Sequence, residues 1–278
     1  MDTDLAIEFM ADRVENEEGI EKTETHLDDI KITTVKILNE SIAKEFNKPI
    51  GEYITLESSK NVNIFDLPSL TNALVESLKN LLGTNDGTVL VVGIGNTEIT
   101  PDALGPKTAA KIFATRHLNS DFIKSLGIGN LKPVATISPG VLGQTGIEVQ
   151  EILRSVSKVV NPVTIILIDA LAAKEVSRLG STLQISNTGI FPGSGVGNKR
   201  AELSDKTLGV PCITLGVPTV ANASMLLSKK MPYSDSQRYI ITSREIDRMI
   251  ETASSSIASA LNIAMQPLID KELLSLIV

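Results

Sequence analysis

Two apolar runs in this chain each lead into an aspartate, and this repeated pattern constrains the fold more than any other feature. Thr88–Val92 is rich in β-branched residues and enters a glycine-containing loop before Asp102, whereas the run from Val163 ends directly at Asp169. Near-continuous apolar runs are typical of strands buried on both faces of a parallel sheet. Because ligands bind at the carboxyl ends of strands in open α/β sheets, we expect the two carboxylates to share one cleft.

Each aspartate is also expected at the start of a helix. Pro101 suits the first helical position, Thr100 offers a capping hydroxyl, and helix-forming residues follow Asp169. Two carboxylates a few ångströms apart cannot both ionise easily, so one keeps its proton and the pair can divide acid and base roles, as in aspartic peptidases. The alternative is that either aspartate is only a capping or turn residue.

Strand and helix patterns alternate along the chain. A half-exposed strand over 32–38 has a possible partner over 51–58, and an amphipathic helix over 67–82 is ended by Gly83. Further elements are predicted at 88–93 (strand), 101–115 (helix), 132–138 (strand), 145–156 (helix), 163–168, 181–185 and 211–216 (strands), 218–229 (helix) and 243–265 (helix). This alternation predicts an α/β fold with a mostly parallel, twisted sheet and helices on both faces.

The length of 278 residues suits one domain with a substantial core. We interpret the whole chain, 1–278, as a single domain. Within it we expect a short arm over 1–8, an N-terminal appendage over 9–80 that is rich in charge at its start, and the core α/β sheet over 84–266.

Composition excludes several classes of protein. Cys212 is the single cysteine, so there is no intramolecular disulfide, and a catalytic thiol would need His26 or His117 as a partner. The formal net charge of −7 and the scattered basic residues argue against direct binding of nucleic acid. No apolar run is long enough to cross a bilayer and the N-terminus is acidic, so we expect a cytoplasmic protein that does not bind membranes.

Two glycine-rich loops lack the spacing of nucleotide-binding motifs. VGIGN at 92–96 is followed by Glu98 where a dinucleotide fingerprint needs glycine, and the loop over 187–200 lacks the Gly-Lys-Ser/Thr ending of a P-loop. We therefore expect no cofactor. The second loop is expected to shape the cleft or a subunit contact, and the alternative is a structural loop without a ligand.

Six segments, in order along nearly the whole chain, carry a family resemblance. They are TDLAIE at 3–8, VVGIGNTEITPDALGP at 91–106, SPGVLGQTGIEVQEI at 138–152, LIDALAA at 167–173, NTGIFPGSGVGNKR at 187–200 and LGVPTVANA at 215–223. Together they closely resemble the germination proteases of spore-forming bacteria. The resemblance implies a single peptidase domain that degrades small acid-soluble spore proteins in the spore core, is made as an inactive zymogen and forms a homotetramer.

The same resemblance places the family's catalytic aspartates at Asp102 and Asp169, the two residues that the strand pattern selects. It also implies a fold similar to the hydrogenase-maturation peptidases, which bind nickel through acidic residues and a histidine. No histidine follows Asp169 here. We therefore expect a metal-free aspartic mechanism, with a nickel-binding maturation-type peptidase as the alternative.

Other site residues follow from their place in the matched segments. Family substrates are cut after a glutamate, which implies a basic group to receive that side chain. Candidates for this group are Lys107, Lys199 and Arg200, and the alternative for each is a solvated surface charge. Residues expected to bind substrate or support the site are Glu148, Gly193, Gly195 and Asn198. For Glu148 the alternative is a helix start, where its charge would favour the helix dipole.

The resemblance further implies that the protein processes its own N-terminus. The segment TDLAIEFMA contains two acidic-to-apolar bonds, Asp4–Leu5 and Glu8–Phe9, and we expect one of them to be cut. TDLAIE begins at residue 3, whereas the family commonly carries a longer leader, so we expect either a short propeptide or a shortened form of the chain.

Overall fold

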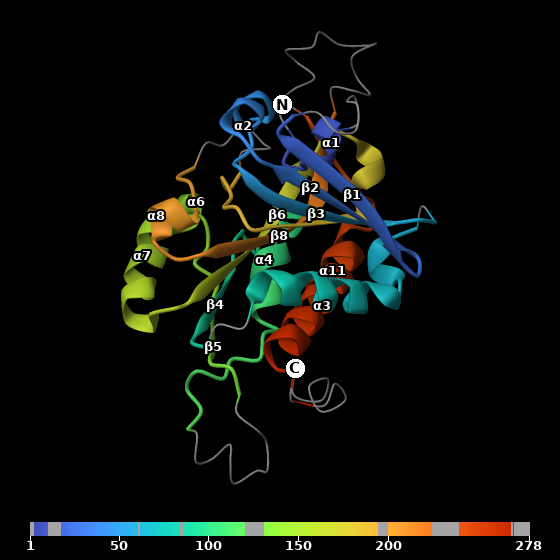
Figure 1. The fold of residues 1–278 in the computed structure, drawn as a ribbon. Coiled ribbons are helices and arrows are strands. Elements are labelled where there is room, and N and C mark those ends of the chain that lie inside the picture. The colour runs from blue at the N-terminus through green and yellow to red at the C-terminus, as the bar shows by residue number, and fades with distance from the viewer. Residues whose placement is uncertain are drawn as a thin grey trace.

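The computed structural model describes residues 3–10, 18–60, 62–83, 86–119, 131–193, 200–223, 239–267 and 269. These residues form an α/β fold in which one nine-stranded sheet carries helices on both faces (Figure 1). The predicted fold class is confirmed. No helix within this described part is long and apolar enough to cross a membrane.

Parallel and antiparallel strands occupy different halves of the sheet. In spatial order the strands are β1 (Ile20–Leu27), β2 (Ile30–Ile37), β3 (Gly51–Ser58), β7 (Thr182–Ser186), β8 (Cys212–Asn222), β6 (Thr164–Ala173), β4 (Val89–Gly93) and β5 (Val134–Ile137), and β9 (Ile240–Thr242) pairs with β8. Strands β8, β6, β4 and β5 are parallel, whereas the pairs from β8 through β7 and β3 to β1 are antiparallel. The predicted pairing of 32–38 with 51–58 is confirmed as β2 against β3.

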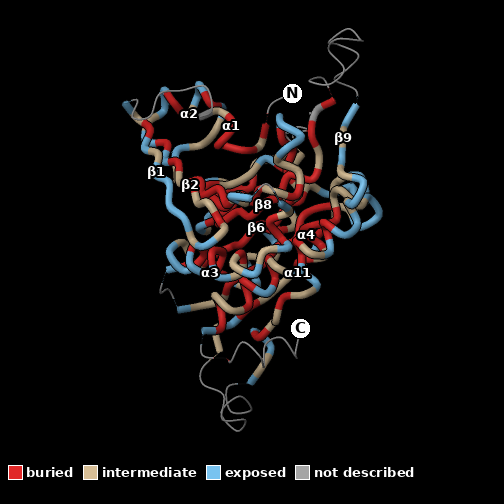
Figure 2. Tube along the Cα trace, turned by 90° about the vertical axis from the view of Figure 1, so that its right-hand side faces the viewer, coloured by how far each residue is buried: buried red, intermediate tan, exposed pale blue. Residues whose placement is uncertain are grey.

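The central strands β4 and β6 send alternate side chains into two separate cores. Val89 and Val91 join the larger core with α3, α4 and α11, whereas Leu90 and Val92 join a smaller core on the opposite face. Full burial of such a side chain contributes roughly 1.5–3 kcal/mol. Both faces of these strands therefore need apolar residues, and buried backbone runs through β6 and β8 while β1 and β9 remain more exposed (Figure 2).

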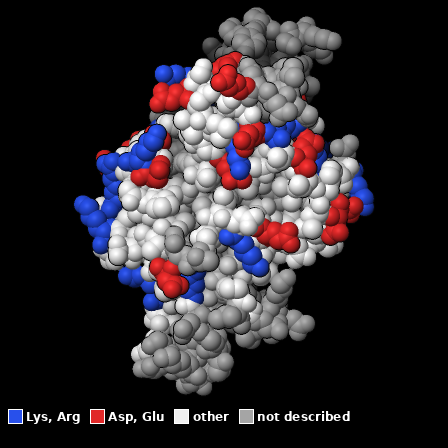
Figure 3. Space-filling model, in the orientation of Figure 1, with Lys and Arg blue, Asp and Glu red and all other residues white. Residues whose placement is uncertain are grey.

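Helices cover both faces of the sheet. On one face lie α3 (Ser69–Leu82), α4 (Leu104–Ala109) and α11 (Ile246–Met265). On the other face lie α7 (Val149–Val160) and α8 (Asp205–Leu208) beside the parallel strands, and α1 (Ile7–Met10) and α2 (Glu40–Phe46) beside the antiparallel ones. The predicted end of α3 is confirmed, since Gly83 follows it with φ of 60°. On the face seen in Figure 3, acidic and basic side chains are interspersed.

The segment after Asp169 is a strand, where the sequence predicted a helix. Strand β6 continues through Asp169 to Ala173 beside β8, with a register shift between Leu171 and Ala172. The backbone N–H of Asp4 also donates to Ala172 O at 2.9 Å. These hydrogen bonds outweigh the local helix propensity of leucine and alanine. The helix predicted at 218–229 is also wrong over 218–222, because these residues belong to strand β8, whose last residues pair with β9. Residues 224–238 lie outside the described residues.

Two further helices begin later than predicted. The short 3₁₀ turn η2 (Thr100–Asp102) precedes α4, so Asp102 lies before the helix rather than inside it. In the predicted helix 145–156, Gly146 with φ of 71° ends the short α6 (Leu142–Thr145), and α7 starts at Val149. A left-handed residue of this kind terminates a helix because it redirects the chain. The remaining 3₁₀ turns of the described chain are η1 (Ile64–Asp66) and η3 (Val176–Arg178).

A glycine contact sets the distance between α4 and the central strands. A Cβ atom at Gly105 would lie 2.2 Å from Ile94 O and 2.5 Å from Ile168 O. Only glycine therefore lets α4 approach the ends of β4 and β6 this closely.

We expect Gly105→Ala to lower the free energy of unfolding by roughly 1–3 kcal/mol, because the added methyl forces α4 away from the strands. Thermal unfolding measures this change. Gly143→Ala in α6 is the matched control, since a Cβ there meets nothing within 4 Å and alanine favours helix. Equal unfolding temperatures for both variants would contradict the tight contact.

Candidate active site

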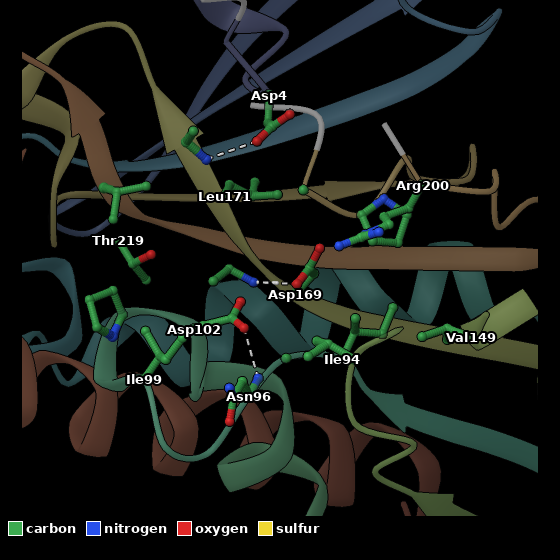
Figure 4. Close-up of a pocket in the computed structure, with 18 of the residues that line it drawn as sticks. Asp4, Ile94, Asn96, Ile99, Asp102, Val149, Asp169, Leu171, Arg200 and Thr219 are labelled. Atoms are coloured by element: carbon green, nitrogen blue, oxygen red, sulfur yellow. Dashed lines mark hydrogen bonds between the residues drawn. The ribbon is translucent and has the colours of Figure 1, made fainter. Parts of the chain in front are cut away.

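A cavity of about 600 Å³ lies at the carboxyl ends of β4 and β6 (Figure 4). Asp102 and Asp169 both line it, as their positions in the sequence predicted. Asp4, Glu148 and Arg200 supply its other charged groups among the described residues. The charged groups of a largely apolar wall are therefore mostly acidic, with one cationic side chain in the described part.

Asp102 is held by the loop that follows β4. Its Oδ2 accepts a hydrogen bond from Asn96 N at 2.8 Å, and Asn96 Oδ1 in turn accepts from Gln144 Nε2 at 2.6 Å. Gly95 has φ of 133°, and a Cβ there would lie 1.9 Å from Asp102 O. The VGIGN loop thus shapes the carboxylate site. Burial raises the pKa of Asp102, and the hydrogen bond from Asn96 opposes that shift.

Asp169 lies inside β6 and is only 5% exposed. Its Oδ1 accepts a hydrogen bond from Ala170 N at 2.9 Å. Burial, followed by repulsion from the carboxylates of Asp102 and Asp4, raises the pKa of Asp169 well above its ordinary value, and the Ala170 hydrogen bond opposes the shift only in part. Burial and neighbouring charge therefore disfavour the ionised form of Asp169 most strongly.

Asp4 brings a third carboxyl group to the site. Its Oδ2 accepts from Ala172 N at 2.8 Å, and it lines both the first cavity and a second one of about 540 Å³. Asp169 and Arg200 line the same two cavities. The sequence predicted Asp4 only as a flank of a cut bond, because nothing in TDLAIE indicates that this segment reaches the ends of β6.

The other predicted processing residues anchor the N-terminal segment. Leu5 is fully buried, and Phe9 stacks on Phe46 with ring centroids 5.7 Å apart. The Glu8 carboxylate accepts from Lys174 N at 2.8 Å and Glu175 N at 2.9 Å. Arg178 Nε lies 3.2 Å from Glu8 Oε1, close enough for an ion pair but not aligned as a hydrogen bond. Sequence patterns gave no signal for the Glu8–Arg178 pair, which joins residues far apart in the chain.

The remaining predicted site residues divide into three groups. Glu148 and Gly193 line the first cavity, and Gly193 lines the second as well. Lys107 instead forms an ion pair with Glu251 at 3.5 Å, and it lines neither cavity. Gly195, Asn198 and Lys199 lie outside the described residues.

The histidines and the cysteine do not line either cavity. Cys212 is buried in β8, where burial and the charge of Asp205 raise its thiol pKa to about 12. A thiol with this pKa is a poor nucleophile at neutral pH. Among the described residues, no three His, Cys, Asp or Glu side chains are grouped to hold a metal ion.

Comparison with known proteins identifies close relatives. A model of the germination protease family matches residues 3–236. The germination proteases of Clostridium acetobutylicum and Clostridium tetani are 38% and 39% identical to this chain, over 96% and 97% of it and the same shares of the relatives. The germination protease of Priestia megaterium is 41% identical over 83% of this chain and 66% of the relative.

A solved structure of low sequence identity was also matched. The [NiFe] hydrogenase maturation protease HycI of Thermococcus kodakarensis is 14% identical, with a TM-score of 0.37, over 66% of this chain and 98% of that chain. The family match and the curated relatives do not favour the nickel-binding alternative. They confirm the resemblance carried by the six sequence segments: the chain belongs to the germination protease family and is a spore protease.

Proposed function

We propose that this protease is an aspartic endopeptidase that degrades small acid-soluble spore proteins during germination. The observation that supports the aspartic type is the placement of Asp102 and Asp169 on one cavity, each with a raised pKa. Like-charged carboxyl groups in a partly buried site share one proton over an intermediate range of pH. In that range one of them is a base while the other is an acid.

The electrostatics support one division of roles. The pKa of Asp169 is raised further than that of Asp102, because Asp169 is more deeply buried and is repelled by two neighbouring carboxylates. Asp102 is then the carboxylate that takes a proton from the attacking water. Asp169 is the acid that gives its proton to the leaving amine.

The basic group for an acidic substrate side chain is Arg200. Among the described residues Arg200 forms no hydrogen bond or ion pair, and its guanidinium extends toward Asp169 in the cavity (Figure 4). Guanidinium groups bind carboxylates with paired, charge-assisted hydrogen bonds. Glu148 and Gly193 line the same cavity. Gly195 and Asn198 complete the proposed substrate-supporting set.

The proposal includes activation by self-processing at the N-terminus, at Asp4–Leu5 or Glu8–Phe9. It is supported by the position of Asp4 on both cavities, next to Asp169. We further propose a homotetramer that works in the cytoplasm of the forespore and the spore core, with spore proteins as its partners and without a metal or cofactor.

We expect Asp102→Asn and Asp169→Asn each to lower cleavage of a small acid-soluble spore protein by at least about 10²–10⁴-fold, because each removes one half of the acid–base pair. Gel analysis of the purified variants, with and without a chelator, measures this. Asp247→Asn, at an exposed position in the first turn of α11, is the matched control. Near-normal cleavage by either cavity variant with normal thermal unfolding would remove that carboxylate from the mechanism, and loss of activity with chelator would contradict the metal-free proposal.

We expect Asp169→Asn to gain thermal stability relative to the wild type as pH rises above 3.8, the ordinary pKa of this group. The folded pKa is raised, so the unfolded chain loses this proton first, and wild-type stability falls as pH rises toward the folded pKa. Asparagine does not titrate. Melting temperatures measured from below pH 3.8 to neutrality test this, and a difference from the wild type that stays constant with pH would show that Asp169 is not strongly shifted.

We expect Arg200→Met to lower kcat/KM for a peptide cut after glutamate by roughly 10- to 100-fold, since a hydrogen bond to a charged group contributes about 1.5–3 kcal/mol. For the same peptide with glutamine in place of that glutamate, kcat/KM should fall much less. Arg154→Met, on the exposed side of α7, is the control. An equal fall in kcat/KM for both peptides would show that Arg200 does not recognise the charge of the glutamate side chain.

A further inference from the structure

The backbone carbonyl of Asp4 is held by two side-chain donors. Lys48 Nζ donates to Asp4 O at 3.0 Å, and Gln184 Nε2 donates to the same oxygen at 3.2 Å. This oxygen belongs to the carbonyl of the Asp4–Leu5 bond. Two donors that converge on one carbonyl oxygen form the arrangement that stabilises the oxyanion of a tetrahedral intermediate.

Both donors are fixed in place by the surrounding fold. Gln184 lies in β7 between β3 and β8, and its Oε1 accepts from Ala6 N at 2.7 Å, which sets the orientation of the amide. Lys48 follows α2, where its own N–H donates to Ala43 O at 3.0 Å. Its Nζ also lies 5.9 Å from the centre of the Phe9 ring, within reach of a cation–π interaction.

The donors share a cavity with a carboxyl group of the acid–base pair. Lys48, Gln184, Asp4 and Asp169 all line the second cavity. Asp4 and Asp169 also line the first cavity, where Asp102 lies. The residue whose carbonyl receives two hydrogen bonds therefore lines the same cavity as Asp169.

We propose that Lys48 and Gln184 form the oxyanion hole for hydrolysis of the Asp4–Leu5 bond. This inference rests on the proposed self-processing and selects that bond over Glu8–Phe9. Water attacks the Asp4 carbonyl carbon and gives a proton to Asp102, while the carbonyl oxygen becomes an oxyanion that accepts from Lys48 Nζ and Gln184 Nε2. The C–N bond then breaks as Asp169 protonates the Leu5 nitrogen, which releases an Asp4 α-carboxylic acid and a Leu5 amine. The α-carboxylic acid returns a proton to Asp169 and becomes a carboxylate, and the amine takes the proton held by Asp102 to become an ammonium.

The charge on Lys48 makes it the stronger of the two donors. A hydrogen bond from an ammonium gains more than one from an amide when negative charge develops on the acceptor. The Glu8 carboxylate, bound by Lys174 N, Glu175 N and Arg178, keeps the rest of the segment in place during the reaction.

The experiment follows loss of Met1–Asp4 by mass spectrometry in the full chain after transfer to mildly acidic buffer. We expect Lys48→Met to slow this cleavage about 10²–10³-fold, in the range found for removal of one oxyanion donor. Gln184→Leu should slow it less, and Lys48→Arg should retain more activity than Lys48→Met because it keeps a cationic donor. Lys44→Met on α2 is the matched control, since Lys44 is 82% exposed and its ion pair with Glu40 lies at the surface.

A role in anchoring alone predicts a different result. If Lys48 only holds the segment, Lys48→Met should loosen it, and hydrogen exchange at the Leu5 and Ala6 amides should speed up in proportion to the loss of cleavage. A slow rate with near-normal exchange supports the oxyanion role, whereas parallel changes overturn it.

Failure of this inference differs from failure of the proposed function. A wild-type chain cut at Asp4–Leu5 and variants cut equally fast would overturn the oxyanion hole alone, as would a wild-type product that begins at Phe9. A wild-type chain that degrades spore protein while its own N-terminus stays intact would contradict self-processing, and this inference with it. Asp169→Asn, included throughout, shows whether any cleavage comes from another protease.

Discussion

The rest of the site depends on one unfavourable feature, a carboxyl group buried in the middle of a strand next to two other carboxyl groups. Burial and the charges of Asp102 and Asp4 disfavour the ionised form of Asp169, and the hydrogen bond from Ala170 N stabilises that form only in part. A free aspartate would lose its proton at ordinary acidic pH. Here the fold favours the protonated form, and a carboxylic acid that stays protonated can donate its proton to a leaving group.

Carboxyl groups that repel one another stay close together only where the backbone that carries them is held in place. Strand β6 is paired along its length, first with both β4 and β8 and then with β8, so Asp169 cannot move outward without breaking a ladder. Asp102 is fixed by the turn before α4, and Gly95 and Gly105 allow this turn and helix to approach the strand ends. Gly95 and Gly105 therefore help to position Asp102 at the ends of the strands.

The features of this arrangement that depend on local sequence patterns could be predicted from the sequence. Apolar runs identified β4 and β6, the helix pattern identified α3 and α11, and the aspartates at strand ends identified the cleft. Local patterns could not show that Leu171–Ala173 and Val220–Asn222 continue as strands, because pairing with distant segments decides their conformation. They also gave no sign that Asp4 meets Ala172, or that Lys48 and Gln184 meet at one carbonyl, since each contact joins segments that are remote in sequence.

The N-terminal segment carries two carboxylates that have different charged neighbours. Glu8 is stabilised by two backbone N–H groups and the charge of Arg178, so it holds the segment on the sheet. Asp4, four residues earlier, adds negative charge beside Asp169 and raises the pKa of that group. Both ends of the segment are thus held by hydrogen bonds, and the Asp4 end also makes the cavity more acidic. Loss of the residues up to Asp4 would relieve the repulsion without releasing the anchor, so the fold can tolerate a cut there better than it could tolerate loss of Glu8.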